Sequence, residues 1–211
     1  LLPAQKKGPF TSILVGSNER IKLDYEHIRR ELTGDPVAYS SLVPYGLTSA
    51  DAVLSQFVAD ERTLGPAVAD AQINSLEYPR YEYFFPWDYT IGRQEQIVAN
   101  HRFIRGLKRQ ARATFIAVLE IDEQDINRFQ KTLAAEDAYL LGFEQFQTGI
   151  SLADQYRLFD AILAMAPWND SLRARIFSQY SHIASGRRDP MERARLLKKA
   201  RQLYEPRAKQ R

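Results

Sequence analysis

The side chains that could carry acid–base or metal chemistry are scattered along this chain. Its three histidines, His27, His101 and His182, lie far apart, and none has a second histidine or a glutamate at the spacing of a helical zinc motif. The chain has no cysteine, which excludes disulfides, thiolate metal ligands and a cysteine nucleophile. It also lacks a glycine-rich phosphate loop and a Gly-x-Ser-x-Gly elbow. The sequence therefore predicts no catalytic residue and no metal site.

Carboxylates gather at two places, Asp122-Glu123-x-Asp125 and Glu136-Asp137. Acidic side chains in the first turn of a helix interact favourably with the helix dipole. We therefore predict that both groups mark the starts of helices and act as caps.

An aromatic segment, Ile73–Tyr89, contains seven aromatic side chains and two prolines. Pro79 and Pro86 exclude a long helix, because each removes a backbone donor and clashes with the preceding turn. We predict an ordered, extended loop packed between an N-terminal α/β part and a helical region. The rings either seal a hydrophobic seam or line a pocket. Acidic residues accompany the basic ones here, so nucleic-acid binding is not expected.

The elements that would position these residues differ along the chain. Thr11–Gly16 has the apolar run of a short buried strand, and Ile21–Leu23 is a second extended piece. Several short helices should follow between residues 24 and 70. They are Tyr25–Leu32 with Asp24 as N-cap, Val37–Leu42, and a helix starting at Thr48-Ser49 in a run that Gly65-Pro66 ends.

From residue 93 onward the apolar residues recur at helical spacing. The predicted helices should stack as antiparallel pairs. Their ranges are Arg93–Leu119, Asp125–Gln147, Leu152–Ala166, Asp170–Ala184 and Met191–Tyr204.

A weak internal repeat runs through this helical part. Leu158-x-x-Ala161-x5-Pro167 recurs as Leu197-x-x-Ala200-x5-Pro206, a shift of 39 residues. Small residues at Gly142 and Ala161 would let two helices approach closely. The pattern predicts tetratricopeptide-like hairpins, and a plain antiparallel bundle is the alternative.

Charge is distributed unevenly over a chain whose net charge is +3. Residues 1–150 carry 16 basic and 20 acidic side chains, whereas residues 151–211 carry 13 basic and 6 acidic ones. The basic C-terminal part is either a solvated helix face with a frayed end or a surface that binds nucleic acid or an anionic membrane. A second basic helix face is predicted within residues 93–119. It consists of Arg102, Arg105, Lys108, Arg109 and Arg112.

Two segments resemble the spermidine synthase family. Residues 12–17 and the adjoining residues 21–25 are similar to the late strand of its Rossmann-type domain and the segment after that strand. Residues 74–86 resemble a loop of the large bacterial members that fuse this domain to membrane helices, although Leu76 replaces the first of two paired acids and Glu77 stands for the second. The resemblance covers about residues 10–90, and the loop positions that match are Asn74, Pro79, Glu82, Tyr83 and Pro86.

The resemblance implies a division of the chain at residue 92. Residues 1–92 would be the C-terminal part of the α/β domain, a short Rossmann-type remnant, and residues 93–211 a helical repeat-like domain. The family transfers an aminopropyl group from decarboxylated S-adenosylmethionine to putrescine. Its glycine turn and catalytic carboxylate would lie before Leu1, so this chain would hold no cofactor itself. Asn74 and Glu82 are the candidates for a supporting or substrate-binding role.

The sequence leaves the function open between an enzyme part and a binding module. In the first hypothesis the chain is a non-catalytic portion of a polyamine aminopropyltransferase-like protein. In the alternative it is a helical-repeat scaffold for protein interaction. A third hypothesis is an anionic-surface binder that uses the basic helices. Expected partners are the rest of a longer parent chain and a protein bound through residues 93–211. No apolar run reaches the roughly 20 residues that cross a bilayer, but the resemblance allows a membrane-bound parent with this part on the cytoplasmic side.

Overall fold

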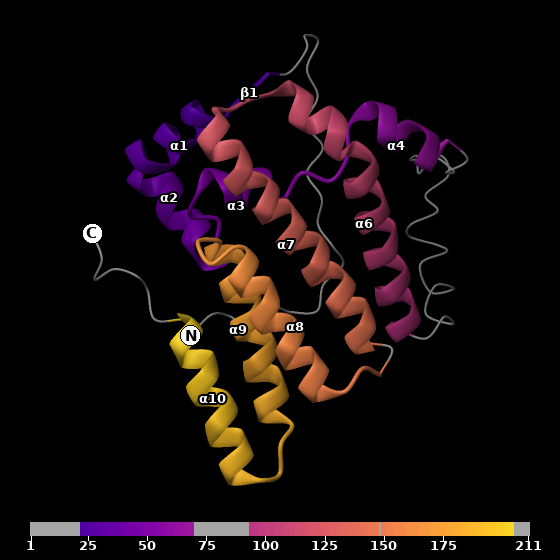
Figure 1. The fold of residues 1–211 in the computed structure, drawn as a ribbon, viewed down its shortest axis with the longest axis vertical. Coiled ribbons are helices and arrows are strands. Elements are labelled where there is room, and N and C mark those ends of the chain that lie inside the picture. The colour runs from indigo at the N-terminus through magenta and orange to yellow at the C-terminus, as the bar shows by residue number, and fades with distance from the viewer. Residues whose placement is uncertain (1–21, 70–92, 148, 205–211) are drawn as a thin grey trace, which may run out of the picture.

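A computed structural model of the chain describes residues 22–69, 93–147 and 149–204 (Figure 1). These residues are mainly helical, as the sequence predicts. The predicted strand Thr11–Gly16 and the aromatic segment Ile73–Tyr89 lie outside the described residues.

The N-terminal elements are short, and acidic or hydroxyl side chains cap them. The Asp24 carboxylate accepts a hydrogen bond from the His27 backbone N–H at 2.9 Å, which confirms Asp24 as an N-cap. Ser49 caps another helix, as predicted, through the Ala52 N–H. The elements are β1 (Leu23–Asp24), α1 (Tyr25–Gly34), α2 (Pro36–Leu42), the 3₁₀ turn η1 (Val43–Tyr45), α3 (Ala50–Leu54) and α4 (Glu61–Val68).

Helix α4 departs from the prediction that Gly65-Pro66 ends the run, because it continues through both residues. The Asp60 carboxylate accepts from the Thr63 N–H at 2.8 Å and starts this helix separately from α3. Pro66 leaves only the Arg62 carbonyl without a helical partner. Arg62 is exposed, so water can take that bond at small cost.

All five long helices predicted from the spacing are confirmed, with ends shifted by at most two residues. Successive helices run in opposite directions across the molecule (Figure 1). They are α6 (Arg93–Val118), α7 (Glu123–Gln147), α8 (Leu152–Met165), α9 (Asp170–Ser185) and α10 (Pro190–Tyr204).

A small parallel pairing joins the two halves of the chain. β1 lies beside β2 (Leu119–Glu120), with Leu23 opposite Leu119 and Asp24 opposite Glu120. The extended piece predicted at Ile21–Leu23 thus falls slightly later. No other strand occurs in residues 22–69, 93–147 and 149–204.

Two hydrophobic cores share helix α7. Its N-terminal half packs with α1, α3 and α6, around Tyr25, Phe115 and Phe129. Its C-terminal half packs with α8, α9 and α10, around Ile176 and Tyr180. The first core contains residues from both sides of residue 92, so α1 and α3 bury their apolar faces against the long helices.

One half of the repeat pattern agrees with the packing. A Cβ on Gly142 of α7 would lie 2.2 Å from Leu158 Cδ2 of α8, so glycine allows the predicted close approach. The prediction for Ala161 is wrong, because Ala161 is exposed, whereas Ala200, its counterpart in the pattern, is buried. The two copies therefore occupy different environments in the bundle.

Candidate functional site

The two binding candidates from the sequence, Asn74 and Glu82, lie outside the described residues, and the three histidines lie on three different helices. His27 and His182 are exposed on α1 and α9, whereas His101 is buried on α6 and stacks on Phe143 with ring centroids 4.4 Å apart. Burial lowers the pKa of His101, and the Arg175 charge adds to this.

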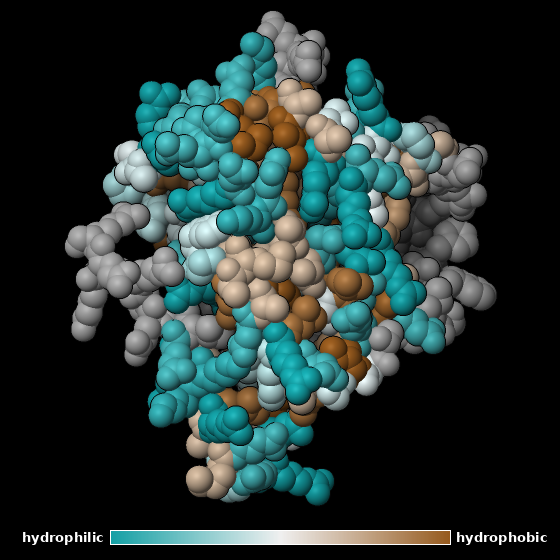
Figure 2. Space-filling model, viewed as in Figure 1, coloured by the Kyte–Doolittle hydropathy of each residue, from teal (hydrophilic) through white to brown (hydrophobic). Residues whose placement is uncertain are grey.

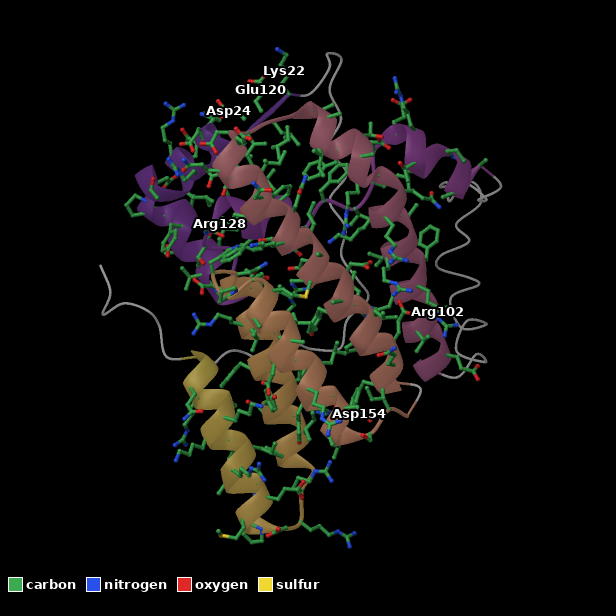
Figure 3. All side chains as sticks on the ribbon, viewed as in Figure 1. Lys22, Asp24, Arg102, Glu120, Arg128 and Asp154 are labelled. Atoms are coloured by element: carbon green, nitrogen blue, oxygen red, sulfur yellow. The ribbon has the colours of Figure 1, made fainter. Side chains whose placement is uncertain are left out.

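The most buried carboxylate lies where the short helices meet α7. Asp51 is fully buried at the start of α3, and Tyr25 donates a hydrogen bond to its Oδ1 at 3.1 Å. Arg128 of α7 places its Nε 2.8 Å from Asp51 Oδ2. Figure 3 labels Arg128 where α7 faces the short N-terminal helices. Both carboxylate oxygens therefore have a partner inside the fold.

Burial is the largest influence on the pKa values of Asp51 and Tyr25. It raises the pKa of Asp51, although Arg128 and the Tyr25 hydroxyl oppose the shift. Burial also raises the pKa of Tyr25, and the Asp51 charge adds to the shift. Tyr25 therefore stays protonated and donates its hydrogen bond to Asp51. This hydrogen bond holds the structure together, and Tyr25 is not a general base with a pKa near neutral pH.

Three carboxylates beside this trio have the spacing of a metal site. Ligand oxygens of Glu26, Asp122 and Asp125 lie within 4.8 Å of one another. Arg29 already pairs with Glu26 at 2.6 Å and lies 3.9 Å from Asp125. Asp122 accepts from the Asp125 backbone N–H at 2.7 Å, which confirms its predicted capping role. Arg29 and the start of α7 therefore already engage these three carboxylates.

A second buried network surrounds Glu136, whose predicted role is wrong. Glu136 and Asp137 lie in the middle of α7 and do not cap a helix. Glu136 is buried and accepts hydrogen bonds from Arg175 and, at 3.4 Å, from Asn169 Nδ2. The Arg175 guanidinium lies 4.7 Å from the centre of the Tyr139 ring. No local sequence signal indicates this pair, because its members are 39 residues apart on different helices.

A small pocket opens between α6 and α7 next to Glu136. Its volume of about 20 Å³ suits about one water molecule. Lys108 donates to the Ser55 carbonyl at 2.6 Å, and Arg112 donates to the Leu133 carbonyl at 3.1 Å. Burial lowers the pKa of Lys108, and the negative charge of Glu136 opposes the shift. The lining residues are Phe57, Lys108, Arg112, Phe115, Leu133, Glu136, Asp137 and Leu140.

Four basic residues of α6 contact α7, and Lys108 contacts the end of α3. Arg102 and Arg105 both pair with Glu144, at 3.4 and 3.2 Å, and Arg109 pairs with Asp137 at 3.3 Å. Arg102 lies in the lower half of α6 (Figure 3). Together with the bonds of Lys108 and Arg112, these contacts use all five cations of the predicted basic face to join helices.

No family model matches this chain, and neither a curated protein nor a solved structure is similar enough to count as a match. None of the helices within the described ranges combines the length and the apolarity needed to span a membrane. Fold and site together define a mainly helical bundle with internally paired charges.

Proposed function

We propose that the described part of this chain is a helical scaffold for protein binding and not a catalytic domain. The observation that carries the proposal is that the most buried carboxylates of this part bond to other side chains of the fold. Asp51 is held by Tyr25 and Arg128, and Glu136 is held by Arg175 and Asn169. Catalytic acids and bases must reach a substrate within hydrogen-bond distance, whereas these groups reach one another.

The size of the pocket supports the same proposal. Ligand pockets for metabolites measure about 300–1,000 Å³, far more than the space beside Lys108. Lys108 is also held by the Ser55 carbonyl, so its ammonium group is already committed. This part of the chain is therefore better suited to presenting surfaces than to enclosing a small molecule.

Within this proposal, the chain supports a spermidine-synthase-like parent instead of carrying out its aminopropyl transfer. The α/β remnant proposed for residues 1–92 has β1 as its one described strand, and β1 pairs in parallel with β2 of the helical part of the chain. The close approach at Gly142 favours tetratricopeptide-like packing of α7 and α8.

Titration calorimetry of the purified chain tests the non-catalytic part of the proposal. The titrants are decarboxylated S-adenosylmethionine and putrescine, added singly and together. We expect no heat beyond dilution, because the pocket beside Lys108 holds about one water molecule and the depression on α10 is lined by a single helix. Tight, stoichiometric binding of decarboxylated S-adenosylmethionine would contradict the proposal and favour the hypothesis that the chain is part of an enzyme.

A further inference from the structure

Helix α10 carries cations that the fold does not use. Arg195, Lys198 and Arg201 are exposed, and none has an ion-pair or hydrogen-bond partner among the described residues. Arg193, two residues before Arg195, is also exposed and unpaired within that part of the chain. At 100° per residue, Arg195, Lys198 and Arg201 project from one side of the helix. We call these three residues the α10 basic face.

The nearest carboxylates within the described residues already have partners of their own. Glu192 lies 3.6 Å from Arg187, and the Asp189 carboxylate accepts from the Met191 backbone N–H at the start of α10. Asp160 of α8 pairs with Lys199 at 2.8 Å.

Lys199 shows what a structural cation on the same helix looks like. Its ammonium lies against Asp160 and 5.2 Å from the centre of the Tyr180 ring. Lys198, its neighbour in the sequence, is exposed and has no ion pair or hydrogen bond with Asp160 or Tyr180, since it lies about 100° further round the helix. One lysine thus holds α10 to the bundle, while the other remains available to a partner.

The surface between these cations is partly apolar. Ala194 and Leu197 line an open depression together with Lys198, Arg201 and Gln202. Met191, at the start of the helix, is 78% exposed. Hydrophilic residues dominate the lower left of the molecule, where α10 lies (Figures 1 and 2). The face therefore offers a narrow apolar strip bordered by positive charge.

We infer that the α10 basic face binds an acidic, amphipathic segment of a protein partner. Carboxylates of the segment would pair with Arg195, Lys198 and Arg201, and its apolar side chains would cover Ala194 and Leu197. This inference rests on the proposed scaffold function and names the chemistry of its partner.

Two other anionic partners fit this face less well. Single-stranded nucleic acids need exposed aromatic rings for base stacking, but the nearby Tyr180 is fully buried. An interfacial membrane helix needs a broad apolar face, whereas the most exposed large apolar residue between residues 190 and 202 of α10 is Met191 at one end.

Fluorescence anisotropy of a labelled peptide tests the inference. The peptide has the length of α10, with glutamates on one helical face and leucines and alanines on the other. We expect saturable binding that weakens when salt shortens the Debye length from about 30 Å to about 8 Å. Reversing the charge of the α10 basic face with R195E, K198E and R201E in one variant should weaken binding of the peptide at least about tenfold. A matched control, R30E with R62E and K131E, changes net charge equally at exposed, dispersed positions and should retain most of the affinity.

The outcomes separate this inference from the proposed function. Equal weakening by both triple variants, or no binding to the unaltered chain, would overturn the acidic-segment inference and leave the scaffold proposal intact. Preferential binding of phosphatidylserine vesicles or of a DNA strand over the peptide would also overturn it. The scaffold proposal itself fails only in the calorimetry with decarboxylated S-adenosylmethionine. A thermal melt of each variant checks that the bundle is folded.

Discussion

Helices α6 and α10 are both rich in basic residues, but the fold uses them differently. On α6, Arg105 is mostly buried and lies 3.2 Å from the buried Glu144. On α10, Arg195 is exposed and has no such partner among the described residues. A basic run by itself therefore does not define a binding surface. A binding surface requires cations that no carboxylate or carbonyl of the same fold has engaged.

Position in the bundle explains the difference. Helix α6 lies beside α7, whose Asp137 and Glu144 face it along two turns. Helix α10 is the last of the described helices and packs mainly on α9 through Leu196 and Ala200, so its outer side meets no other helix (Figure 1). No other described helix therefore engages the outward charges of α10.

The largest expected effect comes from breaking the buried pair between α7 and α9. Glu136→Gln should reduce the free energy of unfolding by about 3–5 kcal/mol, because it leaves Arg175 as an uncompensated cation. Urea denaturation followed by circular dichroism measures this loss. Replacing both partners, E136L with R175M, should cost less than the single change, since no charge is then left unpaired. If the double variant is at least as unstable as E136Q, the unpaired charge of Arg175 is not the cause of the lost stability.

A smaller effect should appear in the pH dependence of stability around Asp51. Burial raises the pKa of Asp51 in the folded chain, so the native state holds this proton at a pH where the unfolded state has lost it. Stability should therefore fall as pH rises from the ordinary value of 3.8 through the folded pKa. The variant D51N lacks this titration, so its stability relative to the unaltered chain should increase with pH over that window. Urea midpoints across the acidic range give the comparison, and a constant difference would contradict it.

The helices themselves could be predicted well from the sequence. In α9, for example, Leu172, Ile176, Tyr180 and Ile183 recur at helical spacing, and all four are buried. Apolar spacing is local information, so it places helices without knowledge of their neighbours.

The roles of the charged residues could not be predicted in the same way. Glu136 and Asp137 look like a helix start in sequence, yet their partners Arg175 and Arg109 come from other helices. Ala161 and Ala200 share a sequence pattern but differ in burial, because only one faces the bundle. Pairing and burial depend on which helices become neighbours, and that is decided by the whole fold.

The difference between α6 and α10 can be measured most directly with two matched charge reversals. R105E places a second acid beside the buried Glu144, and Arg102 compensates only in part. We expect this variant to lose about 2–3 kcal/mol of unfolding free energy in urea denaturation. R195E changes an exposed, unpaired cation on α10, and its unfolding free energy should stay within about 0.5 kcal/mol of the unaltered chain. Equal losses in the two variants would contradict this distinction, because the α10 cations would then be as structural as those of α6.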